Sequence, residues 1–309
     1  MVGKVWFMSV PHISVLWQPI NDYLAGAARV IDGTLGAGGH TRILLESGVE
    51  HVLGLDLDMH AIQIATANLT PFGDRATIMH GSYADMTDYA AQIGWDTVDG
   101  ILLDLGVSSM QLDVAERGFA FMKSGPLDMR FDQSAMQASA ADVVNTWGEE
   151  ELAGIFYRYG EERFGRQIAR SIIKNRPFDT TTQLANVIEK SVPRQKKQGI
   201  HPATRVFQAL RIAVNDELTT IERVLPKAID LLRPGGKLAV ISFHSLEDRI
   251  VKHVFKEAST EIISPPGMVL EEKRASVKLL TRKPIVADDE EIRLNPRSRS
   301  AKLRVVEKL

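Results

Sequence analysis

The sequence predicts an α/β protein in which a doubly wound parallel sheet is interrupted, after its fourth strand, by an all-helical insertion. Three observations predict this fold. Short apolar runs alternate with amphipathic stretches from Ala28 to Gly106, which is typical of parallel strands joined by helices. A glycine-rich loop follows the first of these runs. The alternation then stops for about a hundred residues, a length that suits a small domain, and returns at Lys237.

The first strand, Ala28–Asp32, leads into the glycine-rich loop. Gly33 is followed by three further glycines before Thr41, where a short helix begins. Glycine allows sharp turns and leaves no side chain between the loop and a ligand, and a helix start offers unpaired N–H groups. The dinucleotide fingerprint G-x-G-x-x-G/A fails here because Thr41 stands at its third position. The loop instead resembles that of S-adenosylmethionine-dependent methyltransferases, with NAD binding and a ligand-free turn as alternatives.

The next three strands end in polar side chains. His51–Asp56 predicts the second strand, and a carboxylate at its end can accept both ribose hydroxyls of an adenosine. Thr77–His80 predicts the third strand, and Val98–Gly106 has the near-continuous apolar run of a buried parallel strand. Right-handed crossovers bring the carboxyl ends of these strands to one edge. Four side chains are expected to meet there: Asp32, Asp56, Tyr83 and Asp104.

The remaining elements follow from helical and alternating periodicity. A short helix is expected within 12–20, and the chain becomes helical after Ser109. The helical stretches are Ser139–Trp147, Glu149–Tyr159, Glu161–Lys174, Thr181–Ser191 and a long one from Thr204 toward Leu232. Arg194–Lys197 predicts an exposed loop. After it come a strand at Lys237–Phe243, a helix at Asp248–Glu257, and a final strand at Ala301–Lys308 with Leu279–Ile285 as its antiparallel partner. The predicted domains are 1–109 and 216–309 for the sheet and 110–215 for the insertion.

Composition restricts the function. The net charge of the 309 residues is −2, so any surface that binds nucleic acid must be a local patch. There is no cysteine, which excludes disulfides, thiolate metal sites and a cysteine nucleophile and suits a cytoplasmic protein. No apolar run is long enough to span a bilayer, and no cluster of metal-ligating residues stands out. We therefore expect neither a membrane segment nor a metal.

Eight stretches together carry a resemblance that covers nearly the whole chain. They are D-G-T-L-G-A-G-G-H at 32–40, D-G-I-L-L-D-L-G-V-S-S at 99–109, R-G-F-A-F-M at 117–122, G-P-L-D-M-R at 125–130, Y-G-E-E-R-F at 159–164, H-P-A-T-R at 201–205, S-F-H-S-L-E-D-R-I-V-K at 242–252 and N-P-R-S-R-S at 295–300. The sequence closely resembles the RsmH (MraW) family of bacterial 16S ribosomal RNA cytosine N4-methyltransferases.

The resemblance implies a Rossmann-like, class I methyltransferase fold with an inserted all-α domain. Because the insertion begins at the end of the fourth strand, where ligands bind, we expect it to recognise the substrate. The resemblance also implies S-adenosylmethionine as cofactor and 16S rRNA in the small ribosomal subunit as partner. Position by position, it implies cofactor contacts at Gly38, Gly39, His40, Asp56, Tyr83, Asp104 and Gln111. His40 could contribute its ring or only its backbone N–H.

Substrate contacts are expected at Ser108, His244, Arg297 and Arg299. The last two belong to a basic cluster with Lys302 and Arg304 that could contact RNA phosphates or be ordinary surface charge. Ser245–Asp248 fits a capping box, so this stretch could simply start a helix. The Asp/Asn-Pro-Pro-aromatic motif usual in amino-methyltransferases is absent, so no general base is assigned.

Two other functions stay open beside rRNA methylation. One is a methyltransferase that acts on a small molecule or a protein, which the near-neutral charge favours. The other is a nucleotide-binding or assembly module without catalytic activity. The sequence does not decide the oligomeric state, and a homodimer stays open.

Overall fold

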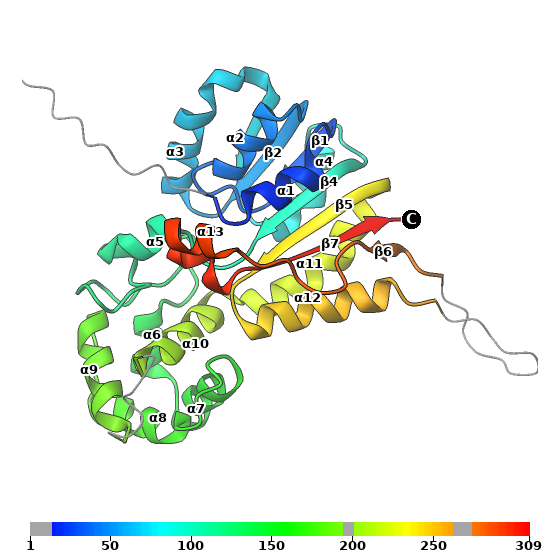
Figure 1. The fold of residues 1–309 in the computed structure, drawn as a ribbon. Coiled ribbons are helices and arrows are strands. Elements are labelled where there is room, and N and C mark those ends of the chain that lie inside the picture. The colour runs from blue at the N-terminus through cyan, green and yellow to red at the C-terminus, as the bar shows by residue number, and fades with distance from the viewer. Residues whose placement is uncertain (1–13, 194–200, 262–273) are drawn as a thin grey trace, which may run out of the picture.

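The computed structural model describes residues 14–193, 201–261 and 274–309 (Figure 1). Its sheet has seven strands in the order β3-β2-β1-β4-β5-β7-β6. All neighbouring pairs are parallel except those of β7, which is antiparallel to β5 and to β6. The strands are β1 (Arg29–Asp32), β2 (His51–Asp56), β3 (Ala76–His80), β4 (Val98–Asp104), β5 (Leu232–Ser242), β6 (Val277–Leu279) and β7 (Lys302–Lys308).

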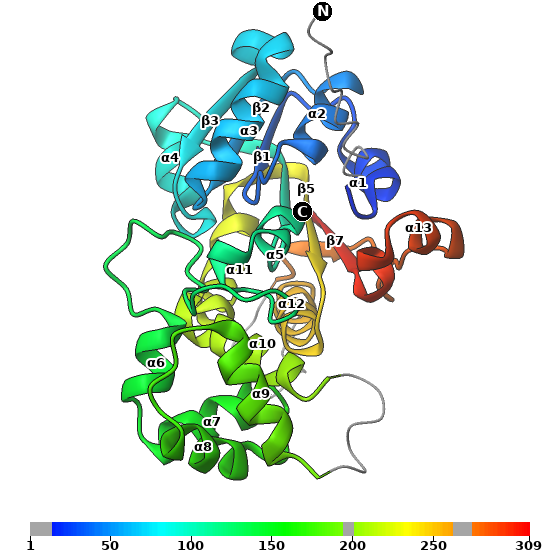
Figure 2. The ribbon, with the colours of Figure 1, turned by 90° about the vertical axis from the view of Figure 1, so that its left-hand side faces the viewer.

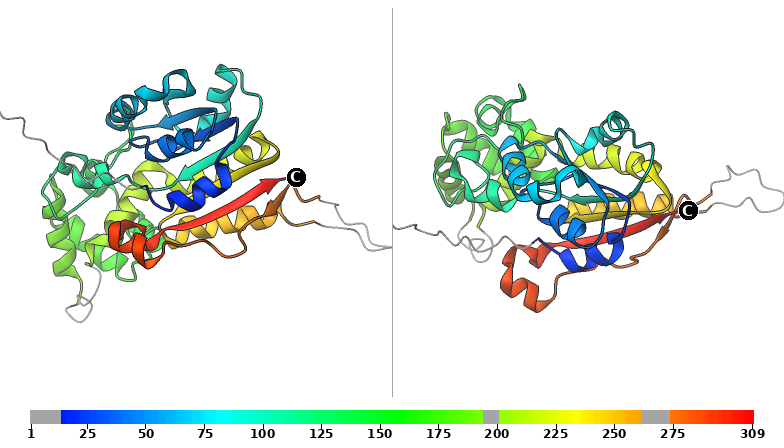
Figure 3. Two further views of the ribbon diagram at one scale, coloured as in Figure 1. Left: turned by 45° about the horizontal axis from the view of Figure 1, so that its top comes forward. Right: turned by 90° about the horizontal axis from the view of Figure 1, so that it is seen from above.

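Helices cover both faces of the sheet (Figure 3). One face packs against α1 (Trp17–Leu24), α2 (Gly39–Glu46) and α3 (Met59–Leu69). The other packs against α4 (Met86–Gln92), α11 (Glu217–Leu231) and α12 (Ser245–Ala258). The central strands read as continuous apolar runs because both of their faces are buried. Each fully buried Leu, Ile or Val side chain contributes about 1.5–3 kcal/mol to folding.

The chain between β4 and α11 forms a helical body beside the carboxyl ends of the parallel strands (Figures 1 and 2). Its helices bury a core of their own, which includes Phe156, Ile168 and Leu210. The elements are α5 (Ser109–Asp113), η3 (Ala115–Arg117), α6 (Ala140–Thr146), α7 (Glu149–Arg158), α8 (Gly165–Lys174), α9 (Thr181–Ser191) and α10 (Ala203–Asn215). The remaining short elements are η1 (Thr70–Arg75), η2 (Tyr83–Asp85), α13 (Asp289–Leu294) and η5 (Pro296–Ser300).

The predicted Rossmann-like methyltransferase sheet is confirmed, but the long helix expected from Thr204 to Leu232 is wrong. It is two helices, because Asp216 has a φ of +48° and ends α10. The antiparallel partner expected at Leu279–Ile285 is also shorter than predicted: β6 ends at Leu279, and Ile285 forms only an isolated bridge with Leu303. The loop expected at 194–197 lies outside the described residues. Within the described part of the chain, every helix is too short or too polar to cross a bilayer.

Candidate functional site

The glycine-rich loop between β1 and α2 is hydrogen-bonded to the end of β2. The backbone N–H of Gly36 donates to Oδ2 of Asp56 over 2.7 Å. Gly36 and Gly38 have φ angles of +53° and +81°, which other residues adopt only with strain. A Cβ added to Gly39 would lie 2.4 Å from Oγ of Ser14. The loop backbone therefore faces the carboxyl edge of the sheet without side chains of its own in the way.

Asp56 is a carboxylate whose ionisation is disfavoured in the free protein. Burial raises its pKa to about 6, hydrogen bonds from the N–H groups of Asp58 and Gly36 oppose the rise, and repulsion from Asp58 and Asp32 adds to it. The hydrogen bond from Asp58 measures 2.8 Å. Each oxygen accepts one N–H and keeps a second lone pair. The ionised carboxylate can therefore accept two further donors, as a ribose diol requires.

Asp32, His40 and Asp104 lie together at the ends of β1 and β4. Oδ2 of Asp32 accepts the hydroxyl of Thr41 over 2.7 Å, and burial raises the pKa of Asp32. Nε2 of His40 lies 3.7 Å from Oδ2 of Asp104. Both Nε2 of His40 and Oδ1 of Asp104 are buried without a hydrogen-bond partner. An unpaired buried polar atom costs about 1–3 kcal/mol, so these atoms indicate a site for a polar ligand.

These residues fit S-adenosylmethionine. The loop offers bare backbone, Asp56 offers acceptors for a ribose, and the acids Asp32 and Asp104 suit an ammonium or sulfonium group. Ionisable side chains whose hydrogen bonds are incomplete are typical of ligand sites. In the described ranges no three His, Asp or Glu side chains gather as a metal site would require.

Tyr83 lies beside this loop but is packed into the core. A Cβ added to Gly33 would lie 2.9 Å from Cβ of Tyr83, so the tyrosine contacts the turn after β1. Its ring packs against the apolar cluster of the α4 and α11 face. Burial raises the pKa of its hydroxyl, and Glu217 and Glu247 raise it further. The adenine contact expected of Tyr83 stays a prediction.

Ser108 and Gln111 form a capping box at the start of α5. Oγ of Ser108 accepts the N–H of Gln111 over 3.2 Å, and Oε1 of Gln111 accepts the N–H of Ser108 over 3.0 Å. Nε2 of Gln111 donates to Oδ2 of Asp58 over 3.1 Å. The same oxygen pairs with Arg117. Gln111 therefore lies at the expected edge of the sheet, where it contacts Asp58, and its expected cofactor contact stays a prediction.

A cavity of about 440 Å³ opens between the sheet and the helical body. Its lining comes from the start of α3, from α5 and η3, and from the segment 131–134. Its lining includes Asp58, Met59, His60, Gln111, Arg117 and Phe131. A cavity with apolar walls and polar edges is typical of a ligand site.

A second cluster of charges is buried beside the turn after β4. Nε and Nη2 of Arg211 donate to the two carboxylate oxygens of Glu217 over 2.7 and 2.9 Å. Oε1 of Glu247 lies 3.1 Å from Nε2 of His244 and 3.8 Å from Nη2 of Arg211. Burial raises the pKa of Glu217; burial also opposes ionisation of Glu247, but His244 and Arg211 lower its pKa. A Cβ on Gly106 would lie 3.8 Å from Oε1 of Glu247, which places the cluster next to the strand end.

The capping box expected at Ser245–Asp248 is wrong by one residue. His244 is the N-cap of α12: its Nδ1 accepts the N–H of Glu247 over 3.4 Å, while Oε2 of Glu247 accepts the N–H of His244 over 3.2 Å. The His244 side chain is only 12% exposed. Capping and ion pairing account for its position, and its expected substrate contact stays a prediction.

The basic cluster near the C-terminus divides into two parts. Arg304 is buried and donates to Asp248 over 2.7 and 3.3 Å, and Lys302 pairs with the same carboxylate at 3.4 Å. Burial against Asp248 leaves Arg304 poorly placed for a phosphate contact, whereas the Lys302 side chain is 39% exposed and its phosphate contact stays a prediction. Arg297 and Arg299 are exposed, and Arg297 pairs with Asp113 at 2.8 Å. These two remain available to a polyanion.

The buried charges at Arg117, Arg211 and Glu217 were not predicted as site residues. A signal for Arg211 existed, because it stands one turn after Phe207 on the apolar stripe of α10. Charged residues at such positions are almost never buried unless they are paired. Arg117 lies in one of the resembling stretches, but nothing in its surroundings along the chain marks it as buried.

Known proteins similar to this chain are rRNA methyltransferases by name. The profile of the MraW methylase family matches residues 9–309. "Ribosomal RNA small subunit methyltransferase H" of Nostoc punctiforme is 48% identical over 306 residues, 98% of this chain and 95% of that protein. The protein of the same name from Syntrophotalea carbinolica is 51% identical, covering 90% and 91%, and that from Deinococcus deserti is 50% identical, covering 97% and 94%. The chain belongs to the MraW methylase family.

Proposed function

We propose that this protein transfers a methyl group from S-adenosylmethionine to the N4 amine of a specific cytidine in 16S rRNA of the small ribosomal subunit, in the cytoplasm. The observation that carries the proposal is the pair of unpartnered polar atoms, Nε2 of His40 and Oδ1 of Asp104, at the glycine loop. The family match across residues 9–309 and the relatives named as rRNA methyltransferases specify the substrate class.

Bound S-adenosylmethionine supplies an electrophilic methyl group on a sulfonium, so the protein mainly has to bind and align. Asp56 would accept the ribose hydroxyls, and Asp104 with His40 would hold the charged end. The backbone of Gly38 and Gly39 would lie against the charged end of the cofactor. Excluding water at this buried edge strengthens each of these polar contacts.

The cytosine amine is a weak nucleophile because its lone pair is delocalised into the ring. The turn after β4, from Asp104 to Ser108, has to orient that amine and accept its hydrogen bonds. The target base must leave its stack to reach this edge. We assign the segment 110–215 to substrate recognition, because it rises from the strand end where the base has to arrive.

Transfer of a radiolabelled methyl group tests the proposal. The acceptors are small ribosomal subunits, free 16S rRNA and an extract of small metabolites. Label should appear in RNA and not in metabolites or protein. Label confined to metabolites or protein would support the alternative methyltransferase, and no label in any acceptor would support a binding module without catalysis.

Asp56→Ala should weaken S-adenosylmethionine binding by about 1.5–3 kcal/mol, the scale of a charge-assisted hydrogen bond. Because the free carboxyl has a pKa of about 6, protons compete with the ribose, and the affinity of the parent protein should fall by up to about tenfold per pH unit below pH 6. Calorimetric titration between pH 5 and 8 measures both effects. The Asp56→Ala protein is the control, and its affinity should lose this dependence; an equally steep fall in both proteins would contradict the assignment.

Removing charge at Arg297 and Arg299 should weaken binding of the small subunit. The slope of log affinity against log salt should flatten by about one unit for each lost phosphate contact. Arg297→Gln and Arg299→Gln are compared with Arg42→Gln, an exposed arginine on α2 that pairs with Glu46. Filter binding at several salt concentrations gives the slopes, and unchanged slopes in both variants would show that these arginines are ordinary surface charge.

A further inference from the structure

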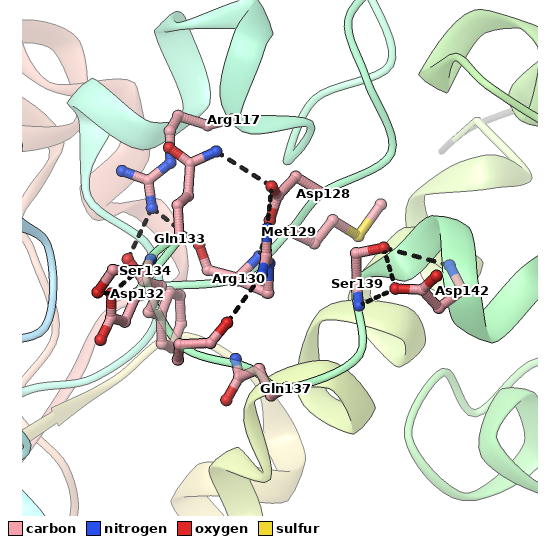
Figure 4. A network of polar contacts seen from close by, with 12 residues as sticks. Arg117, Asp128, Met129, Arg130, Asp132, Gln133, Ser134, Gln137, Ser139 and Asp142 are labelled. Atoms are coloured by element: carbon pink, nitrogen blue, oxygen red, sulfur yellow. Dashed lines mark hydrogen bonds and ion pairs between the residues drawn. The ribbon is translucent and has the colours of Figure 1, made fainter.

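Arg117 connects the cofactor edge of the sheet to the segment at 131–134 that lines the cavity. Its Nη1 pairs with Oδ2 of Asp58. Its Nη2 donates to the carbonyl oxygens of Arg130 and Phe131 over 2.8 Å each (Figure 4). The Arg117 side chain is 9% exposed. The guanidinium therefore connects Asp58, beside the sheet, to the backbone of residues 130–131 in the helical body.

At one end of this connection, Asp58 is hydrogen-bonded to Asp56, the carboxylate proposed to hold the ribose. The N–H of Asp58 donates to Oδ1 of Asp56 over 2.8 Å, and Oδ1 of Asp58 caps α3 by accepting the N–H of His60 over 3.0 Å. Gln111 donates to the same oxygen of Asp58 that Arg117 contacts. Asp56, Asp58 and Arg117 therefore form one continuous chain of polar contacts.

The other end of this connection is the hydrogen-bonded loop formed by residues 128–135. Met129 is buried with a φ of +61°, a left-handed conformation that its surroundings have to maintain. Asn215 of α10 does so: its Nδ2 donates to the carbonyl oxygen of Met129 over 2.7 Å, and its Oδ1 accepts the N–H of Phe131 over 2.8 Å. Arg130 and Asp128 pair through two hydrogen bonds of 2.9 Å across the turn (Figure 4).

Residues 131–134 of the loop line the cavity together with the start of α3, so the position of the loop affects the shape of the cavity. We propose that Arg117 is a positioning residue that couples occupancy of Asp56 by the cofactor to the placement of the 128–135 loop, so that cofactor and RNA binding reinforce each other. Only the RNA part of this proposal rests on the proposed function. The chain of contacts from Asp56 through Asp58 and Arg117 to the loop is present whichever substrate is methylated.

Arginine is required at this position because its planar guanidinium can donate to the two backbone carbonyls and to the Asp58 carboxylate at the same time. Arg117→Lys keeps the charge beside Asp58 but cannot hold both carbonyls. Arg117→Met leaves Asp58 buried and unpaired, so it is combined with Asp58→Asn to keep the protein folded. Arg176→Met is the matched control: Arg176 donates to the carbonyls of Val144 and Trp147 within the helical body and contacts nothing at the cofactor edge.

Amide hydrogen exchange with and without S-adenosylhomocysteine tests the coupling without RNA. In the parent and in Arg176→Met, the nucleoside should slow exchange in 128–135 as well as at Asp56. In Arg117→Lys the slowing at Asp56 should remain while that in 128–135 disappears. Slowing of 128–135 in Arg117→Lys, or none in the parent, would overturn the proposal.

The second measurement is the affinity of small subunits with and without S-adenosylhomocysteine. The parent should bind about 5–150-fold more tightly with the nucleoside, the usual range of coupling between sites. Arg117→Lys and the Asp58→Asn, Arg117→Met pair should lose this factor, and Arg176→Met should keep it. An equal loss in Arg176→Met would show a merely structural role. Failure of the parent to methylate any RNA would refute the proposed function, while the exchange result would still decide the coupling.

Discussion

Arg211→Met is expected to lower the free energy of unfolding by about 3–5 kcal/mol, the usual cost of breaking a buried ion pair by removing one partner. The guanidinium donates two hydrogen bonds to Glu217 and lies 3.8 Å from Glu247. Both carboxylates are almost fully buried. Without the arginine, two negative charges remain in the interior with only His244 nearby.

The stability lost in Arg211→Met should be larger at high pH than at low pH. Burial already raises the pKa of Glu217, and removing the arginine that opposes this shift raises the pKa further. A carboxyl whose folded pKa is raised stabilises the fold at low pH and loses that contribution as pH rises through the folded pKa. Urea unfolding at pH 5 and pH 8 measures this. Arg211→Met should therefore be closer to the parent at pH 5, and adding Glu217→Gln should recover part of the loss at pH 8.

A loss for Arg211→Met below about 1 kcal/mol, the scale of an exposed ion pair, would contradict the burial of this cluster. Arg170→Met is the matched control. Arg170 pairs with Glu149 at 2.8 Å on the surface of the helical body, where its side chain is 65% exposed. Its removal should change stability by less than about 1 kcal/mol.

Replacing residues 114–209 by a Gly/Ser linker is expected to abolish methylation of small subunits while S-adenosylmethionine still binds measurably. The Asp56 and Asp104 ends of the sheet lie outside the deletion, and the helical core is separate from the two cores that flank the sheet. The linker ends before Arg211 so that the buried pair with Glu217 stays intact. Some affinity for the cofactor should be lost, because Asp58 loses Arg117.

Calorimetric titration and transfer of labelled methyl groups measure the two outcomes on one preparation. The control is the full chain with Asp56→Ala, which keeps the recognition segment but should bind the cofactor weakly; its methylation of subunits should be lost at limiting cofactor and recover as the cofactor concentration is raised. Methylation of subunits by the shortened protein at near the parent rate would show that 110–215 is an accessory scaffold rather than the substrate-recognition part.

The sheet was predictable because its signals are local. The apolar run of β4 needs burial on both faces, and Asp56 and Asp104 are the last residues of their strands, so the topology alone brings them to one edge. The glycine loop was predictable for the same reason: its glycines stand where positive φ angles are needed.

The pairings between distant residues were not predictable. Asp216 interrupts a continuous helical pattern with its positive φ, and Glu217 immediately after it pairs with Arg211 of α10. Arg304 stands in a basic run that suggests a surface, but β7 places it beside Asp248 of α12. Such pairs depend on which elements pack together, and periodicity carries no information about that.

Incubation of small ribosomal subunits with S-adenosylmethionine that carries a deuterated methyl group tests the central claim most directly. The subunits come from cells without this protein, and nucleosides from their 16S rRNA are analysed by mass spectrometry. The account predicts the deuterated methyl group on N4 of cytidine, at one position of the RNA, and none with the Asp56→Ala protein at limiting cofactor. Label on another atom or another base, or label in protein or metabolites only, would contradict it.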